Sequence, residues 1–113
     1  MIPDIIDPPF VSVIVTTYNR AEMIGITLDS LIRQNYPKDK CEIIVCDNNS
    51  SDSTIDVVSQ YQSKSHVPLK YVVEQRQGVH YARNTAATHT QGEIIYYTDD
   101  DMIAHPDLLR EII

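Results

Sequence analysis

The chain has 113 residues, of which 42% are hydrophobic and 22% charged, and its formal net charge is −7. This length fits one domain with one hydrophobic core, because domains of about 100–150 residues are the commonest. The acidic balance argues against a protein that binds a nucleic-acid backbone, and no segment approaches the roughly 20 consecutive apolar residues of a membrane span.

The apolar residues fall into short runs that alternate between strand and helix patterns. Residues 1–10 are Pro-rich and lack periodicity, which indicates a lead-in segment. The β-branched run 11–17 predicts a strand, and Asn19 followed by Glu22 is typical of a capped helix start. The helix that follows is expected to bury one apolar stripe, formed by Ile24, Leu28, Leu31 and Ile32.

A second strand is predicted over residues 42–46 and ends at Asp47. Ser53 and Asp56 have the spacing of a capping box and predict a second helix. The inward face of that helix is expected to carry Ile55, Val58 and Gln62. A third strand is predicted over residues 69–73.

Gly78 is expected to open a third helix, with its buried face formed by Val79, Ala82 and Ala86. Small side chains on that face allow a helix to pack closely on a sheet. A fourth strand is predicted over residues 93–97. His105 and Pro106 predict the start of another helix, because proline is favoured in the first helical turn.

Strands that alternate with helices pair in parallel through right-handed crossovers. The sequence therefore predicts an α/β fold, with a Rossmann-like, mainly parallel sheet and helices on both faces in an α/β/α sandwich. In such a sheet, ligands bind beyond the carboxyl ends of the strands. Polar residues follow all four predicted strands at that end, at positions 16–20, 47–49, 75–77 and 99–101.

The three consecutive aspartates after the fourth strand are costly without a cation. Two unit charges about 6 Å apart repel by roughly 3 kcal/mol at an effective dielectric constant near 20. In an extended segment Asp99 and Asp101 face one side and Asp100 the other. Two carboxylates then remain for one ion, and Mg²⁺ or Mn²⁺ accepts such ligands together with phosphates. The alternative is a solvated acidic loop before a helix.

Asp47 and Tyr18 each have two interpretations. Asp47 either caps the helix that follows or accepts a hydrogen bond from a base or ribose, and Tyr18 either lies against a flat base or is a turn aromatic. The chain contains neither a glycine-rich dinucleotide motif nor a P-loop. An EF-hand is excluded because Asp52 stands where the calcium loop needs glycine.

Four segments, taken in order, closely resemble the family 2 glycosyltransferases of the GT-A fold. They are residues 11–20, residues 43–52, Gly78 with Ala82-Arg83-Asn84, and residues 92–101. The resemblance implies that residues 11–113 are the nucleotide-sugar-binding part of a GT-A glycosyltransferase domain that is truncated at its C-terminus.

The resemblance implies transfer of a sugar from a nucleotide diphosphate donor, with UDP as the expected nucleotide, and inversion at the anomeric carbon. By that similarity Thr16 and Tyr18 would line the base pocket, and Asp47 would bind the base. His80 could also face the base. Arg83 either contacts the donor or braces the sheet.

The same resemblance gives the aspartates roles in an Asp-x-Asp motif. Asp99 would sit near the ribose, and Asp100 is expected to belong to the same nucleotide-sugar site. Asp101, with Asp99, would hold the Mg²⁺ or Mn²⁺ that bridges the diphosphate. The family's acceptor surface and acidic general base would lie beyond Ile113, so we expect weak donor binding and no transfer by these residues alone.

Several expectations about partners accompany this assignment. The acceptor is a saccharide, a lipid or a protein, which the residues do not distinguish. No nucleic-acid partner is expected, and apolar surface exposed by truncation could lead to self-association. The expected location is the cytoplasm or, in a longer parent protein, the cytoplasmic face of the membrane.

Two other functions stay open. A nucleotidyltransferase has a similar sheet, but such proteins carry a glycine-rich phosphate loop after the first strand, and residues 16–20 contain no glycine. A non-catalytic module that binds nucleotide or packs against a partner would keep the fold without the activity. The intact Asp47 and the three aspartates at 99–101 argue against such decay.

Overall fold

The computed structural model describes residues 7–113, so residues 1–6 of the predicted lead-in segment lie outside the described residues. The strands are β1 (Val11–Thr17), β2 (Cys41–Asp47), β3 (Leu69–Val73) and β4 (Ile94–Asp99). All their pairings are parallel, and the order across the sheet is β3-β2-β1-β4. The helices are α1 (Ala21–Ile32), α2 (Thr54–Lys64), α3 (Val79–Ala87) and α4 (Leu108–Glu111), with a 3₁₀ turn at Lys38–Lys40.

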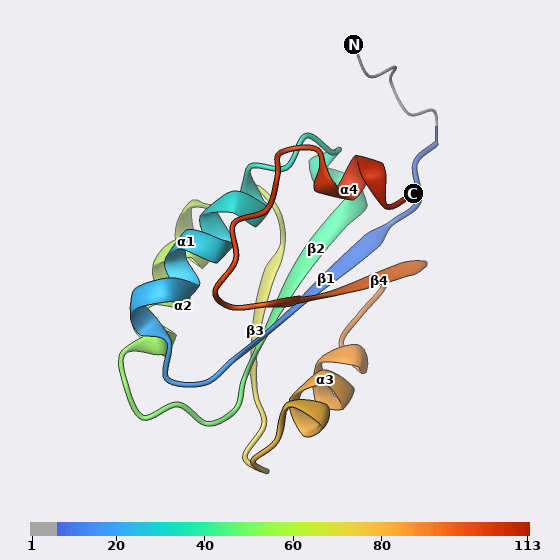
Figure 1. Cartoon of the computed structure of the whole chain (residues 1–113). Coiled ribbons are helices and arrows are strands. Elements are labelled where there is room, and N and C mark those ends of the chain that lie inside the picture. Colours follow the sequence, from blue (N-terminus) through green and yellow to red (C-terminus); the bar gives the residue numbers. More distant parts are fainter. Residues whose placement is uncertain (1–6) are drawn as a thin grey trace.

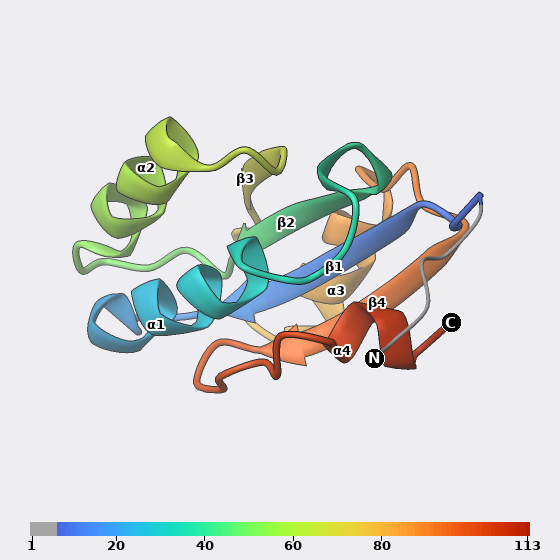
Figure 2. The same cartoon turned by 90° about the horizontal axis from the view of Figure 1, so that it is seen from above.

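Helices cover both faces of the sheet, as predicted. One face packs against α1, α2 and α4, and the other packs against α3 (Figures 1 and 2). The smaller core beneath α3 consists of Ile14, Ile44, Cys46, Ala82 and Ala86. The α/β/α prediction is therefore confirmed, and the two small alanines lie in the helix face that contacts the sheet.

The position of each strand explains its sequence. β1 and β2 are the central strands and are buried on both faces, so almost every residue in them is buried and their apolar runs are nearly continuous. β3 and β4 are the outer strands, and their residues are mostly half-buried or exposed. The observed β2 begins at Cys41, one residue before its predicted start. The observed β4 continues to Asp99, two residues beyond its predicted end.

The starts of α1 and α2 differ from the capping-box predictions. Asn19 has a φ of 50°, and its Oδ1 accepts a hydrogen bond from the backbone N–H of Asp52 at 3.3 Å. Asp52 caps both helices, because Oδ2 accepts from the N–H of Ala21 at 3.1 Å and Oδ1 accepts from that of Thr54 at 3.0 Å. Ser53 makes no side-chain capping bond. A carboxylate suits this position because free N–H groups and the positive dipole end meet there.

The buried helix faces confirm one prediction and correct another. Ile24, Leu28 and Leu31 of α1 are buried, with Ile32 packed against the same core. In α2, Ile55 is 49% exposed and Gln62 is exposed, contrary to prediction. The inward row follows helical spacing from a different start and consists of Thr54, Val57, Val58 and Tyr61.

The last helix is shorter than the His105-Pro106 pattern predicts. α4 begins at Leu108 and has four residues. His105 Nδ1 instead accepts a hydrogen bond from the N–H of Asp107 at 3.1 Å, which forms a turn before the helix. Within residues 7–113, none of the helices combines the length and apolar character needed to cross a bilayer.

A buried carboxylate ties together the amino ends of the strands. Glu42 of β2 is 1% exposed and accepts hydrogen bonds from Ser12 Oγ at 2.7 Å, the N–H of Gln91 at 2.7 Å and Lys70 Nζ at 3.0 Å. Burial raises the pKa of Glu42, but these hydrogen bonds outweigh it and the pKa is lowered. A Cβ on Gly92 would lie 2.6 Å from Ser12 Oγ, so only glycine fits beside this network.

Candidate functional site

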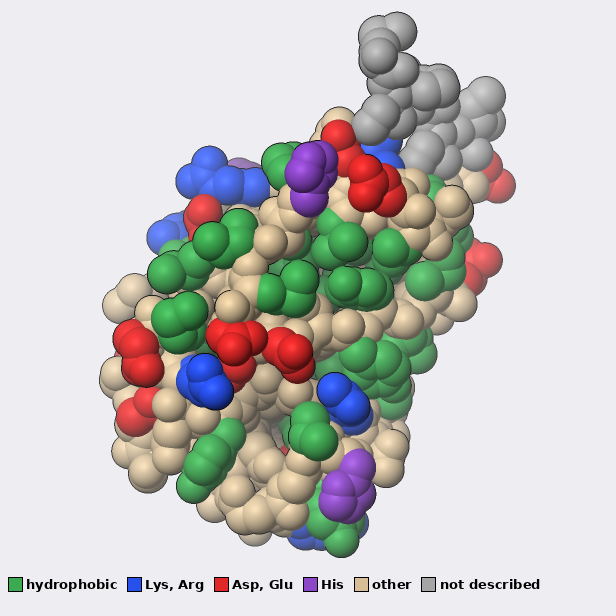
Figure 3. All heavy atoms as spheres, viewed as in Figure 1, with side chains coloured by type: hydrophobic (Ala, Val, Ile, Leu, Met, Phe, Trp, Pro, Cys, Tyr) green, Lys and Arg blue, Asp and Glu red, His purple; other side chains and the backbone are tan. Residues whose placement is uncertain are grey.

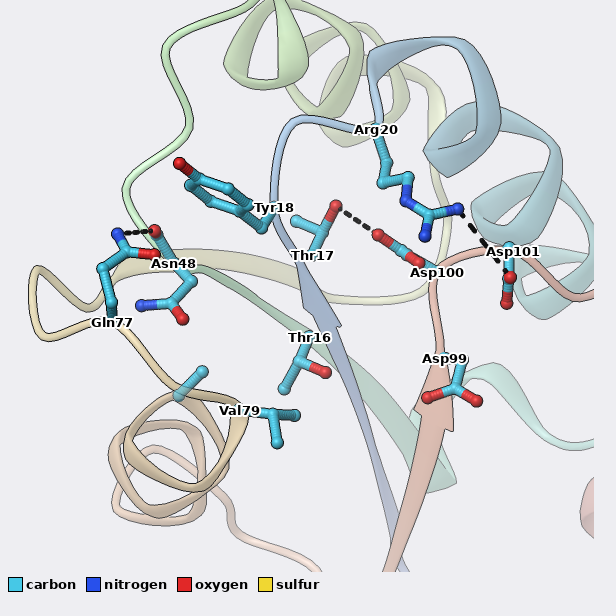
Figure 4. Close-up of a pocket in the computed structure, with 11 residues that line it drawn as sticks. Thr16, Thr17, Tyr18, Arg20, Asn48, Gln77, Val79, Asp99, Asp100 and Asp101 are labelled. Carbon is cyan, nitrogen blue, oxygen red and sulfur yellow. Dashed lines mark hydrogen bonds and ion pairs between the residues drawn. The ribbon is translucent and has the colours of Figure 1, made fainter.

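A cleft of about 380 Å³ opens at the carboxyl ends of the strands (Figure 4). Segments far apart in the sequence line it, namely Thr16, Thr17, Tyr18, Arg20, Asn48, Gln77, Val79, Ala82, Asp99, Asp100 and Asp101. This is the end of a parallel sheet at which ligands bind. The structure therefore brings Thr16, Tyr18 and the three aspartates to one cavity.

The two threonines at the end of β1 point to opposite sides, because side chains alternate along a strand. Thr16 pairs in register with Asp99 of β4 and lies on the α3 side of the cleft (Figure 4). Thr17 lies toward α1 and donates a hydrogen bond to Asp100 Oδ2 at 2.8 Å. Val79, predicted to be buried, is 49% exposed and lines the cleft instead. The buried residues of α3 are Ala82 and Ala86, and Ala87 packs against the same core.

The three aspartates have different environments. Asp100 is 9% exposed, and its backbone oxygen also accepts a hydrogen bond from Thr27 Oγ1 of α1 at 2.9 Å. Asp99 and Asp101 are exposed. The middle carboxylate is therefore held in place, while the outer two remain accessible from the cleft.

Asp101 has a basic neighbour in the lining of the cleft. Arg20 Nη1 lies 3.8 Å from Asp101 Oδ2, and the two side chains are 48% and 49% exposed. Figure 3 shows acidic side chains gathered where β4 ends, with basic side chains beside them. The carboxylate thus remains largely hydrated.

Asp47 lies at the end of β2 but does not line the cleft. It is 2% exposed, and Oδ1 accepts hydrogen bonds from the N–H and Oγ of Ser50 at 2.8 and 2.6 Å. Oδ2 accepts from Tyr71 Oη at 2.5 Å. Burial, followed by this hydrogen bond, raises the pKa of Tyr71. Asp47 therefore shapes the loop before α2 rather than capping the helix, and its role in base binding stays a prediction.

His80 and Arg83 are exposed on α3, outside the lining of the cleft. The His80 ring packs on Tyr81 with centroids 4.0 Å apart. The Arg83 guanidinium lies 5.9 Å from the ring centroid of Tyr97 in β4. That contact joins α3 to the sheet, which is the bracing alternative, and contacts of His80 or Arg83 with a donor stay predictions.

Asn48 is a site residue that the sequence analysis did not single out. Its Nδ2 donates to the backbone oxygens of Glu74 and Arg76 at 2.9 and 2.7 Å, and its Oδ1 accepts from the N–H of Gly78 at 2.9 Å. Gln77 Nε2 donates to the Asn48 backbone oxygen at 2.9 Å. Asn48 therefore anchors the loop before α3, where Gly78 has a φ of 138° that favours glycine.

A buried carboxylate, Glu74, strengthens the same loop. Glu74 is 7% exposed and accepts hydrogen bonds from Arg76 Nη2 at 2.8 Å and Thr85 Oγ1 at 2.5 Å. Hydrogen bonds from Arg76 and then Thr85 lower the pKa of Glu74 to about 2. The Arg76 guanidinium also lies 4.6 Å from the ring centroid of Tyr81. The α3 side of the cleft is thus held by several polar contacts.

The predicted metal ligands provide only part of a coordination sphere. Among residues 7–113, no group of three or more His, Cys, Asp or Glu side chains is arranged to hold a metal ion. Asp99 and Asp101 offer two accessible carboxylates at one cleft. Mg²⁺ is commonly held by one or two carboxylates, water and substrate phosphates. The residues therefore fit an ion that is shared with a phosphate ligand.

Comparison with known proteins identifies the family. Residues 12–113 match the model of glycosyl transferase family 2. The chain belongs to this family. It is 39% identical over 103 residues to glycosyltransferase AglE of Haloferax volcanii, a match that covers 90% of this chain and 34% of AglE.

Two solved structures have a similar fold. The Staphylococcus aureus TarS 1-349 structure in complex with UDP has a TM-score of 0.84 and 31% identity, over 91% of this chain and 30% of that one. The Pyrobaculum calidifontis mannosyltransferase PcManGT, in complex with GDP-Man and Mn²⁺, has a TM-score of 0.78 and 42% identity, over 82% and 28%. The predicted family and GT-A fold are confirmed, and the chain spans about a third of the length of these relatives.

Proposed function

We propose that this glycosyltransferase chain binds the nucleotide-sugar donor of an inverting sugar transfer. The observation that carries the proposal is the cleft at the strand ends, which Thr16 and Tyr18 line together with the exposed Asp99 and Asp101. Complexes of TarS with UDP and UDP-GlcNAc, and of PcManGT with GDP-Man and Mn²⁺, support a nucleotide-sugar ligand.

We propose UDP as the nucleotide, with GDP as the competing outcome. The TarS complex with UDP covers 91% of this chain, whereas the GDP-Man complex covers 82% but has the higher identity. Tyr18 is 49% exposed at the cleft, so its ring offers a surface on which a base can stack. Asp47 would reach the base only by exchanging its hydrogen bond with Tyr71.

The three aspartates at 99–101 would have different roles in binding the donor. Asp99 and Asp101 would hold Mg²⁺ or Mn²⁺ and lie next to the ribose and diphosphate. When bound, the ion supplies positive charge where the leaving diphosphate becomes more negative. Asp100 is already bonded to Thr17, so its part in the nucleotide-sugar site would be to keep its two neighbours in position.

The experiment is calorimetry with UDP and GDP, each with and without Mn²⁺, and with CTP and UTP for comparison. We expect UDP to bind only weakly without Mn²⁺ and more tightly with it. A preference for CTP or UTP would favour a nucleotidyltransferase. Absence of any nucleotide binding would contradict the proposal and favour the non-catalytic module.

We also propose that transfer needs an acidic general base and an acceptor surface outside these residues, since the chain spans about a third of its relatives. An assay of sugar transfer by the 113-residue chain should show no turnover, and robust turnover would refute this part. The acceptor class, the cytoplasmic location and self-association stay predictions.

A further inference from the structure

The cleft contains an unequal set of charges. Three carboxylates line it, and among the described residues Arg20 is the only lysine or arginine that does so. A diphosphate carries negative charge, so it meets like charges on one wall of this cleft. Arg20 is the protein's own source of compensating charge at that position.

Arg20 combines a hydrogen-bonded backbone with a half-exposed side chain. Its backbone oxygen accepts hydrogen bonds from the N–H groups of Met23 at 3.0 Å and Ile24 at 2.9 Å, at the start of α1. Its guanidinium has one ion pair in the structure, 3.8 Å from Asp101, and the side chain is 48% exposed. A long ion pair between half-exposed groups contributes little, so either partner can exchange it for a stronger one.

We propose that Arg20 is a donor-binding residue that pairs with Asp101 in the ligand-free cleft and moves to the donor's diphosphate when Asp101 takes a divalent cation. This inference rests on the proposed function. A guanidinium and a divalent cation compete for the same carboxylate oxygen, so binding of one weakens the other. The planar fork of Arg20 also matches phosphate oxygens, which a released guanidinium can bind in a bidentate manner.

The neighbouring groups are consistent with this exchange. Asp100 Oδ2 already accepts the Thr17 hydroxyl, so this carboxylate has less capacity to attract Arg20. Asp52 is bonded to the N–H of Ala21 and to Thr54, which leaves Asp101 as the carboxylate that Arg20 contacts. In Figure 4 the Arg20 side chain extends toward Asp101.

The test compares Arg20→Met with the unaltered chain in two titrations, because the proposal predicts opposite signs. With Mn²⁺ alone, the variant should bind about threefold more tightly, since a competing positive charge is removed. With UDP in saturating Mn²⁺, it should bind about tenfold more weakly, since a charge-assisted hydrogen bond is lost. Arg20→Lys keeps the charge without the fork, so it should restore the Mn²⁺ affinity but only part of the UDP affinity.

Arg33→Met is the matched control, because Arg33 is also ion-paired with an aspartate, Asp29 of α1, but lies outside the cleft. It should change neither titration. If the unaltered chain binds UDP with Mn²⁺ and Arg20→Met shifts both affinities in the same direction or neither, the role of Arg20 is refuted while the proposed function stands. If the unaltered chain binds neither Mn²⁺ nor UDP, both proposals are refuted.

Discussion

At the amino ends of the strands Glu42 is buried and accepts three hydrogen bonds, whereas at the carboxyl ends Asp99 and Asp101 are exposed and Asp101 has one ion pair of 3.8 Å. A charge removed from water must be fully paired, and Glu42 meets that condition with partners from β1, β3 and the loop before β4. The exposed aspartates keep their capacity to bind something else. The same chemical group therefore stabilises the fold at one end and serves a ligand at the other.

Asp100 is intermediate between these two cases. It lies at the functional end, yet it is 9% exposed and bonded to Thr17. A charged group next to a binding site thus has a structural role when a hydroxyl from a neighbouring strand satisfies it. Single substitutions can test whether each carboxylate stabilises the fold or binds a ligand, as its hydrogen bonds and exposure indicate.

The largest effect is expected from Glu42→Ala. This change leaves Lys70, Ser12 and the N–H of Gln91 without their acceptor, which should lower the free energy of unfolding by about 3 kcal/mol. Urea denaturation measures it, with the exposed Glu93→Ala as control. If Glu42→Ala lowers the free energy of unfolding as little as the control does, the buried carboxylate at the amino ends of the strands does not stabilise the fold.

Asp101→Asn should weaken ligand binding and leave the stability of the fold nearly unchanged. The variant removes a proposed metal ligand, so the affinity for UDP in the presence of Mn²⁺ should fall more than tenfold, which is about 1.4 kcal/mol. The free energy of unfolding should stay within about 0.5 kcal/mol, because the side chain is exposed. Asp39→Asn, an exposed aspartate outside the cleft, is the control for the titration.

Thr17→Val should have a smaller effect on stability. It removes the hydroxyl that bonds Asp100 while keeping the shape of the side chain, and the loss should be about 1 kcal/mol in urea denaturation. Thr16→Val is the paired control, since Thr16 is half-buried on the other side of the strand. Equal losses in both variants would mean that Asp100 does not depend on this bond.

The smallest expected effect is the loss of the stabilisation by Glu42 at acidic pH. Hydrogen bonds lower the pKa of Glu42 below its usual 4.5, so the folded state binds its proton less readily than the unfolded state does. Its stabilisation is fully present above the unfolded pKa and disappears as the pH falls through the folded value. In urea denaturation from pH 6 downward, the stability difference between the unaltered chain and Glu42→Gln should shrink below about pH 4.5. A constant difference would contradict the lowered pKa.

The sequence predicted the sheet well because burial leaves a strong local signal. Residues Val13, Ile14 and Val15 lie in a strand covered on both faces, and the stripe of α1 follows helical spacing. Asp99 and Asp101 could be located at the cleft because four strand ends meet at one edge. The separation of Asp100 from its neighbours was predicted for an extended segment, but β4 ends at Asp99, and Asp100 and Asp101 lie in a turn. Asp100 is nevertheless the buried one of the three.

Other features depend on partners distant in sequence, which local patterns do not contain. Asp52 caps α1 from 31 residues away, so the local pairs at Asn19 and Ser53 gave the wrong caps. Asn48 bonds to a loop 26 to 30 residues later. The position of Asp47 at a strand end was predictable, but its hydrogen bond to Tyr71 required the register of β2 and β3.

The double cap formed by Asp52 couples two helices that are adjacent in space but not in sequence. When this carboxylate swings out to solvent, the first turns of α1 and α2 lose an acceptor at the same moment. Their amide protons should therefore exchange with deuterium at similar rates, and Asp52→Ala should accelerate both together. Loss of the Asp52 contact at the start of α2 would then also loosen the start of α1, which Arg20 immediately precedes. Motion at the start of one helix would therefore change the position of the Arg20 guanidinium.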